Sequence, residues 1–197
     1  MDPYYEDKQT TLYLADAFQV LPELEAFDAL VTDPPYASGT RSEAKKSSSG
    51  SMLRGKHLGS RLAEPIALDQ MTTTGFLFLI RQIALAAYPL LPEGGSFLSF
   101  IDWRQWPSLI GALETVNFRI QSMIVWDKGK FGLGNGFRNQ HELIVHASKG
   151  VPEVYNRSTA NVIGARPLRA ADIGHPSPKP PDLLAKLIDV VAPEGGV

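Results

Sequence analysis

An acidic residue, two prolines and a tyrosine follow an apolar run near the start of the chain. Asp33, Pro34, Pro35 and Tyr36 come directly after residues 27–32, which read Phe-Asp-Ala-Leu-Val-Thr. A proline has a fixed φ and no backbone N–H, so the carbonyl groups here are acceptors on a stiff loop. A carboxylate, a carbonyl oxygen and a flat aromatic ring together suit a planar ligand ring that carries an exocyclic NH₂ group.

Such an amine is a weak nucleophile because its lone pair is delocalised into the ring. Two acceptors that hold its hydrogens push the nitrogen towards tetrahedral geometry and localise the lone pair, which can then attack an electrophilic methyl group placed in line. This chemistry relies on positioning and electrostatic stabilisation, without a covalent enzyme intermediate. Taken alone, the same four residues also fit an ordinary turn.

Alternating strands and helices are predicted to position this segment. Residues 10–15 read as a short strand ending at Asp16, and residues 27–32 as an apolar strand ending at Asp33, typical of a parallel strand covered on both faces. Ligands bind beyond the carboxyl ends of such strands. We therefore expect Asp16 and Asp33 at one edge of an α/β sheet, in adjacent strands.

The remaining elements follow from periodicity and turn signals. We expect helices and strands over these ranges: helices 72–88, 106–116 and 180–191, and strands 96–101, 118–126 and 140–147. Residues 148–174 read as irregular. The apolar face of the first helix suits either core packing or a dimer interface.

The composition excludes several classes of protein. The chain has 197 residues, 44% of them hydrophobic, which is enough for one domain with a buried core. Its net charge is −2, so binding of a polyanion has to come from a local patch. The chain has no cysteine, which excludes disulfides, thiolate zinc sites and cysteine nucleophiles. Alternation on a strand puts His141 and Glu142 on opposite faces, so we expect no metal site.

Nothing in the chain resembles a membrane or export signal. No stretch approaches the roughly 20 uninterrupted apolar residues of a membrane span, and the N-terminal sequence MDPYYEDKQTT is acidic and polar. We expect a cytoplasmic protein without a membrane partner.

Several segments together resemble one family, the S-adenosylmethionine-dependent amino-methyltransferases of DNA. The segment DPPY resembles their catalytic motif, and the similarity extends to LYLADAFQVLPEL, LLPEGGSFLSF, MIVWDKGKFGLGNGFRNQHELIVHASKG and HPSPKPPDLLAKLI. The order of these segments resembles the permuted class often called β. The resemblance implies a Rossmann-like class I methyltransferase fold in permuted order, with S-adenosylmethionine as cofactor and double-stranded DNA as partner.

The resemblance also implies roles for individual residues. Asp33 and the Pro34 carbonyl, on the loop stiffened by Pro35, would hold the target amine, and Tyr36 would stack on a base extruded from the duplex. Trp126 is a candidate for the opposite face of that base, with core packing as an equal alternative. Cofactor contacts are implied for Asp16, Ala17, Asp33, His175, Ser177 and Lys179.

Two further segments are candidates for contacts with DNA. Residues 37–70 are basic and rich in serine and glycine, which predicts a mobile loop that is either solvated without a partner or holds phosphates. Residues 151–173 are a candidate for a short target-recognition segment. Phosphate contacts are assigned to Arg41, Lys45, Lys46, Arg54, Lys56 and Arg138. The family often has glutamine where this chain has Pro178, so no side-chain contact is expected there.

The absence of cysteine and the first residue of the DPPY segment limit which atom of a base can be methylated. Methylation of cytosine at carbon 5 needs a cysteine nucleophile, which is absent, so an exocyclic nitrogen remains. Asp33 at the first motif position resembles the adenine-N6 enzymes more than the cytosine-N4 enzymes, which often carry serine. We expect a site-specific DNA adenine-N6 methyltransferase of the restriction-modification kind, of bacterial or phage origin. The alternatives are a cytosine-N4 enzyme, or an inactive or split nucleic-acid-binding subunit.

One family feature is expected beyond the C-terminus. Residues 92–95 read Pro-Glu-Gly-Gly and precede a strand, and residues 193–196 repeat this sequence just before the final Val197. In the permuted order, the glycine-rich strand–loop–helix that cradles the methionine part of the cofactor follows such a turn. We therefore expect residues 1–197 to form a single catalytic domain that is incomplete at its C-terminus. The alternatives are that the remainder lies in a longer chain, that a partner supplies it, or that the chain is a decayed remnant.

Overall fold

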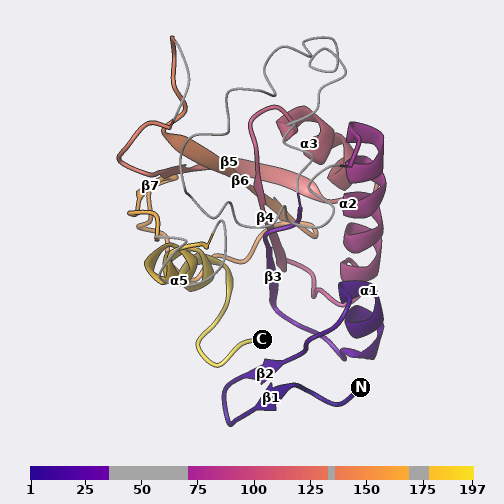
Figure 1. The fold of residues 1–197 in the computed structure, drawn as a ribbon. Helices are drawn as coiled ribbons and strands as arrows, with labels where there is room; N and C mark the ends of the chain where they lie inside the picture. The colour runs from indigo at the N-terminus through magenta and orange to yellow at the C-terminus, as the bar shows by residue number, and fades with distance from the viewer. Residues whose placement is uncertain (36–70, 133–135, 169–177) are drawn as a thin grey trace, which may run out of the picture.

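A five-stranded mixed sheet forms the centre of the protein (Figure 1). The computed structural model describes residues 1–35, 71–132, 136–168 and 178–197. The strands of the sheet are, in spatial order, β3 (Ala29–Thr32), β4 (Ser96–Ile101), β6 (His141–Ser148), β5 (Arg119–Asp127) and β7 (Val162–Gly164). The pairs β3–β4 and β5–β7 are parallel, whereas β6 runs antiparallel to both of its neighbours.

The register brings several strand ends to one edge of the sheet. Thr32 pairs with Ser99, so the residues after β3 lie beside the last part of β4. On the next strand Leu143 pairs with Ile101, so β6 begins where β4 ends. The connection between β5 and β6 therefore lies at the same edge as the carboxyl ends of β3 and β4.

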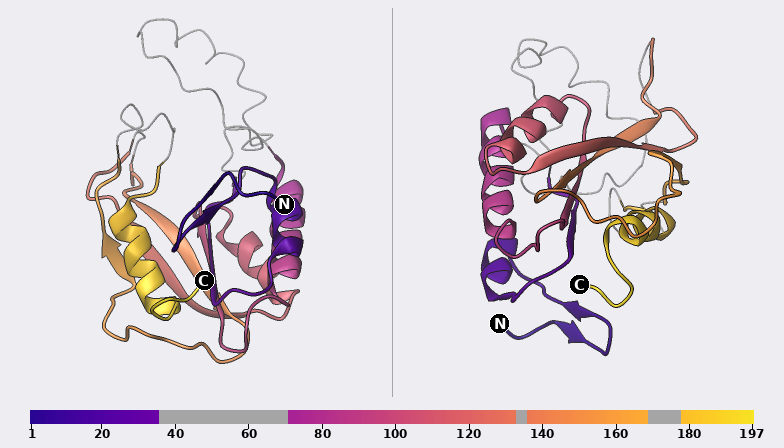
Figure 2. Two further views of the ribbon diagram at one scale, coloured as in Figure 1. Left: turned by 90° about the horizontal axis from the view of Figure 1, so that it is seen from below. Right: turned by 180° about the vertical axis from the view of Figure 1, so that it is seen from behind.

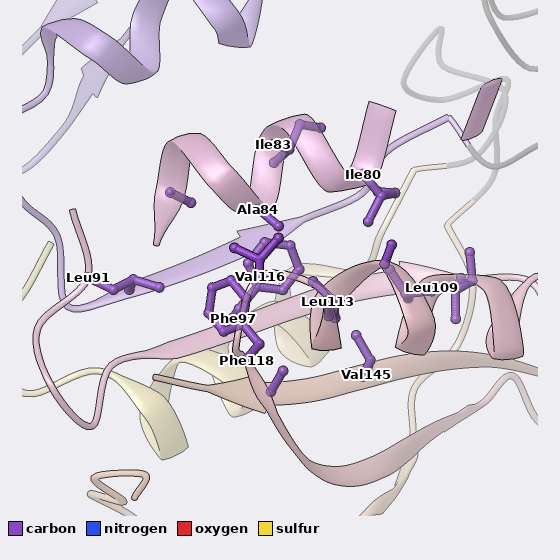
Figure 3. Close-up of a cluster of buried hydrophobic side chains, with 14 of the residues drawn as sticks. Ile80, Ile83, Ala84, Leu91, Phe97, Leu109, Leu113, Val116, Phe118 and Val145 are labelled. Carbon is purple, nitrogen blue, oxygen red and sulfur yellow. The ribbon is translucent and has the colours of Figure 1, made fainter. Parts of the chain in front are cut away.

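Helices cover both faces of the sheet (Figures 1 and 2). The helices are α2 (Thr73–Ala87) and α3 (Trp106–Glu114) on one face, and α5 (Pro181–Val191) on the other. Alternation along β4 supplies both layers, because Phe97 packs under α2 and α3, and Leu98 packs under α5. Figure 3 shows the first of these clusters, around Phe97, Leu113 and Phe118.

The helix starts follow from local chemistry. The side chain of Thr72 accepts a hydrogen bond from the Gly75 N–H at 3.1 Å and so caps α2. Helix α5 begins with Pro181, whose fixed φ suits a first turn, and Asp182 lies in that turn near the positive end of the helix dipole. The predictions for these two helices, for α3 and for strands β4, β5 and β6 are confirmed to within a few residues.

The N-terminal strand prediction is wrong in its placement. Only Thr11–Leu12 is a strand (β2), and it pairs antiparallel with β1 (Tyr5–Glu6) in a separate two-stranded sheet. Asp7 explains this hairpin, because its Oδ1 accepts from two N–H groups of the turn at 2.8 Å each. These hydrogen bonds also lower the pKa of the Asp7 carboxyl. A locally closed hairpin competes with addition of this segment to the main sheet.

The two Pro-Glu-Gly-Gly turns have matching conformations. Gly94 and Gly195 both have positive φ, of 86° and 77°. In each turn the last glycine N–H donates at 3.0 Å to the proline carbonyl, from Gly95 in the first and from Gly196 in the second. The first turn leads into β4. After the second, the Val197 carbonyl accepts from the Asp28 N–H at 2.6 Å, beside the start of β3.

Candidate active site

Asp33 follows β3 directly and lies at the carboxyl edge of the parallel β3–β4 pair. Its side chain is 33% exposed. The next residue, Pro34, is buried, and Pro35 is half-buried. Asp33 and Pro34, whose carboxylate and carbonyl group are the predicted acceptors, therefore lie at the edge of the sheet where ligands bind in such folds. Tyr36 lies outside the described residues.

Lys179 comes from the far end of the sequence to contact Asp33. Its Nζ lies 2.9 Å from Asp33 Oδ2 and 3.4 Å from Glu142 Oε2. Its side chain is only 6% exposed, and the ammonium group lies 5.1 Å from the centroid of the Phe100 ring. A buried ammonium is tolerated because two carboxylates and an aromatic face compensate the lost hydration.

Glu142 and Lys128 extend this contact into a network of four charges. Glu142 lies on β6, is 16% exposed, and pairs through its other oxygen, Oε1, with Lys128. Lys128 follows the end of β5 and lies over the ring of Trp126, 4.8 Å from its centroid. Carboxylates and ammonium groups therefore alternate from Asp33 to Lys179, Glu142 and Lys128, and the network has no net charge.

Trp126 belongs to the core beneath α5. It is 2% exposed, and its ring meets Phe100 edge-on with 6.5 Å between centroids. Its indole N–H donates to the Ala165 carbonyl at 2.8 Å. This placement favours the core-packing alternative over a stacking role.

Asp16 is used locally. It caps the short helix α1 (Ala17–Val20), where its Oδ1 accepts from the Phe18 N–H at 2.9 Å. Both Asp16 and Ala17 are exposed. Because the preceding strand joins the separate hairpin, Asp16 does not end a strand beside β3 as the sequence predicted.

Arg138 lies between β5 and β6, and the described residues on either side of the gap at 133–135 extend away from the sheet (Figure 1). Its Nε donates to the Gly132 carbonyl at 2.7 Å, and its guanidinium lies 4.0 Å from the centroid of the exposed Phe131 ring. Residues 128–140 contain two lysines, one arginine and no acidic residue. The other residues expected to contact phosphates lie outside the described ranges, as do His175 and Ser177.

The segment 151–173, expected to be irregular, contributes a strand. Val162–Gly164 (β7) pairs with β5, and Thr159, Ala160 and Asn161 line a cavity of about 90 Å³ under α5. His146 lines the same cavity and contacts Ser96 at 3.0 Å, and burial lowers its pKa. Four described residues of the candidate target-recognition segment 151–173 line this cavity: Thr159, Ala160, Asn161 and Ile163. The individually named candidates Asp16, Asp33, Trp126, Arg138 and Lys179 are not among its lining residues.

The described residues offer neither a metal site nor a membrane-spanning helix. Within residues 1–35, 71–132, 136–168 and 178–197, no group of three or more histidine, aspartate or glutamate side chains is placed to hold a metal ion. None of the helices described is long and apolar enough to cross a membrane.

The chain belongs to the N6/N4 methyltransferase family of DNA methylases, whose family model matches residues 27–162. The match covers more than half of the chain and includes β3, Asp33, β4 and the β5–β6 pair. The chain is thus a DNA methyltransferase of the class that acts on exocyclic amines. A comparison with curated proteins gave no match.

Solved structures agree in fold. The chain is similar to the cytosine-N4-specific PvuII DNA methyltransferase, with TM-score 0.68 and 13% identity over 97% of this chain and 73% of that one. It is also similar to M1.HpyAVI, with TM-score 0.59 and 17% identity over 92% and 75%. A structure of M1.HpyAVI in complex with SAM gives TM-score 0.55 and 17% identity over 90% and 72%. At such identities the likeness establishes the class I-like fold.

Glu142 and Lys128 are the residues of this site to which the sequence assigned no role. A signal was present, because Lys128 lies two residues after Trp126, on the same side of an extended segment. The register that brings Glu142 opposite Trp126 became visible only in the folded sheet.

Proposed function

We propose that this chain carries the catalytic site of an S-adenosylmethionine-dependent enzyme that methylates the N6 amine of adenine in double-stranded DNA. The observation that carries the proposal is the half-open carboxylate of Asp33, held at 2.9 Å by Lys179 at the carboxyl edge of β3 and β4. Family membership limits the chemistry to methylation of DNA.

Asp33 and Pro34 divide the work of holding the amine. The Asp33 carboxylate accepts one N–H of the target amine, and the Pro34 carbonyl accepts the other, which localises the nitrogen lone pair. Tyr36 stacks on the base after it leaves the duplex. As the nitrogen gains positive charge during methylation, the negative charge of Asp33 stabilises it more strongly than in the ground state.

The residues present fit part of a cofactor site. Asp16 is exposed, and its hydrogen bond to Phe18 uses Oδ1, so that Oδ2 can accept from the adenine amine of the cofactor. S-adenosylmethionine, when bound, supplies the electrophilic methyl group. A structure of M1.HpyAVI with SAM supports this choice of donor.

Adenine is preferred over cytosine because the motif begins with Asp33, although the PvuII enzyme of similar fold is cytosine-N4-specific. The cytoplasmic location and pairing with a restriction enzyme stay predictions. A dimer stays a prediction as well. The apolar face of α2 that suggested it packs in the core, with Phe76, Ile80 and Ile83 buried there, while Phe78 and Leu85 of the same helix are exposed.

The test is transfer of a tritiated methyl group from S-adenosylmethionine to unmethylated duplex DNA, followed by identification of the labelled nucleoside. We expect N6-methyladenine from the wild type and none from Asp33→Asn. Glu114→Gln, which changes an exposed carboxylate on α3, is the matched control and should retain full activity. Label on cytosine would replace the adenine assignment with the N4 alternative, and no label from the wild type would contradict the proposal.

A further inference from the structure

The charge network at the sheet edge links Glu142, on a central strand, through Lys179 to Asp33, the carboxylate proposed to hold the target amine. Glu142 sits on β6, which is paired on both sides. Lys179 sits between two carboxylates and is the least exposed member, whereas Asp33 is the most exposed. The contact of Lys179 with Asp33 uses Oδ2, which leaves Oδ1 as the oxygen for a ligand.

Asp33 needs a partner to define its carboxylate. The last torsion of an aspartate side chain joins sp³ and sp² atoms and is broad, so the backbone alone does not aim the two oxygens. A salt bridge to a fixed ammonium gives the carboxylate one orientation. At 2.9 Å, Lys179 is close enough to do this.

Lys179 in turn needs Glu142. A lysine side chain is a flexible four-carbon stem that ends in a point charge, so its position depends on what surrounds the ammonium. Here Glu142 contacts it at 3.4 Å, and the Phe100 ring lies 5.1 Å away. Pro180 and Pro181 follow directly and restrict the backbone at the start of α5.

We propose that Glu142 and Lys179 are positioning residues for the reaction of Asp33, with Glu142 fixing Lys179, and Lys179 aiming the carboxylate at the target amine. This inference rests on the proposed function. It assigns Lys179 to the amine-holding carboxylate, whereas the resemblance placed it near the cofactor. Lys128 contacts Glu142 through the other carboxylate oxygen, so Glu142 can still pair with Lys179 when Lys128 is replaced.

Single-turnover methyl-transfer rates test the order of action. We expect Lys179→Met to lower the rate about 100-fold, the size of effect that misplacement of a reacting group produces. Glu142→Gln should lower it about tenfold, in the range found for outer groups that orient a reacting one. The double variant should be no slower than Lys179→Met alone, because Glu142 acts only through Lys179.

Four further readouts separate positioning from simple structural support. Lys179→Arg should restore part of the rate, and Lys128→Met should change it less than Glu142→Gln does. The exposed Lys8→Met and Glu114→Gln are matched controls and should have the wild-type rate. In the Lys179 and Glu142 variants, the affinities for duplex DNA and S-adenosylmethionine should stay within about threefold of the wild type while the rate falls, as expected when only the transition-state geometry is lost.

Two results would overturn the proposal. One is that the effects of Lys179→Met and Glu142→Gln multiply in the double variant, and the other is a fall in cofactor affinity at an unchanged rate.

Crystal structures of the wild type and of Glu142→Gln give a readout that needs no activity. We expect Lys179 within hydrogen-bonding distance of Asp33 in the wild type, and displaced or spread over several positions in the variant. A wild-type crystal in which Lys179 points away from Asp33 would refute the positioning role, even if methyl transfer occurs. Absence of methyl transfer together with an intact Glu142–Lys179–Asp33 contact that depends on Glu142 would instead refute the proposed function alone.

Discussion

Asp16 and Asp33 have the same local sequence pattern, an apolar run that ends in an aspartate, but the fold uses them differently. Asp33 ends a strand of the main sheet and is held by Lys179, which lies 146 positions further along the chain. Asp16 follows a two-residue strand of a separate hairpin and caps its own helix. The difference shows that a carboxylate becomes part of a polar network when distant elements converge on it, whatever its local pattern.

The largest expected effect is on the reactive carboxylate. Asp33→Asn keeps the size of the side chain but removes the charge that stabilises the methylated nitrogen. Methyl transfer should fall by about 100- to 1,000-fold, as on loss of a preorganised electrostatic group. Single-turnover rates beside Asp16→Asn measure the contrast, and equal losses in both variants would remove the distinction drawn between these residues.

The second effect is on stability at the buried part of the network. Glu142→Ala removes a carboxylate 3.4 Å from the buried ammonium of Lys179, and it also removes the carboxylate that pairs with Lys128. The free energy of unfolding in urea should fall by about 3 kcal/mol, the lower end for breaking a buried pair. The exposed Glu114→Ala should change it by less than about 0.5 kcal/mol. A similar small change in both would indicate that the network contributes little to stability.

A substitution at Trp126 tests whether this side chain serves core packing or stacking on the extruded base. Trp126→Phe keeps a ring but leaves the Ala165 carbonyl without its indole donor. We expect a loss of about 2 kcal/mol in unfolding free energy, from the lost hydrogen bond to the half-buried Ala165 carbonyl and from the space that the smaller ring leaves in the core. DNA binding should be unchanged. The exposed Trp103→Phe is the control for stability. A large loss of base extrusion, measured by 2-aminopurine fluorescence, at unchanged stability would restore the stacking role.

Two substitutions at Asp16 separate its role as helix N-cap from the role of its negative charge. Asp16→Ala should cost about 1 kcal/mol of stability because the N-cap of α1 is lost. Asp16→Ser keeps a cap acceptor but has no carboxylate. We expect both variants to bind S-adenosylmethionine more weakly, by calorimetry, although only the alanine variant loses the cap. Unchanged cofactor affinity in both would limit Asp16 to its local role.

The smallest effect concerns pH and His146, on the same strand as Glu142. Burial lowers the pKa of His146 below its usual 6.5, so the folded protein takes up this proton less readily than the unfolded chain. The stability due to the neutral ring is complete above pH 6.5 and is lost as the pH falls through the lowered pKa, with a slope of at most about 1.4 kcal/mol per pH unit. His146→Gln should flatten this dependence in urea titrations, and a dependence that stays as steep in this variant would contradict the assignment to His146.

Sequence reasoning was most successful where the pattern is local and periodic. The apolar run before Asp33 predicted a strand in the sheet, and periodicity predicted helices over residues 72–88 and 180–191, where α2 and α5 lie. The Pro-Glu-Gly-Gly repeat seen in the sequence has a structural counterpart, because Gly94 and Gly195 both have positive φ.

The failures have physical causes. The N-terminal strand was misplaced because the turn closed by Asp7 competes with the sheet, and this local hydrogen bonding outweighs the apolar pattern of residues 10–15. The contact of Lys179 with Glu142 depends on strand register and on the approach of α5 to the sheet. Neither of these follows from the periodicity of hydrophobic residues in a single sequence.

The most direct test of the account is a structure of the protein with a short duplex and a non-reactive analogue of S-adenosylmethionine. The account predicts an extruded adenine whose N6 lies within hydrogen-bonding distance of Asp33 Oδ1 and of the Pro34 carbonyl oxygen, with Lys179 still on Oδ2. An extruded base bound elsewhere, with Asp33 contacting only lysine or solvent, would contradict it.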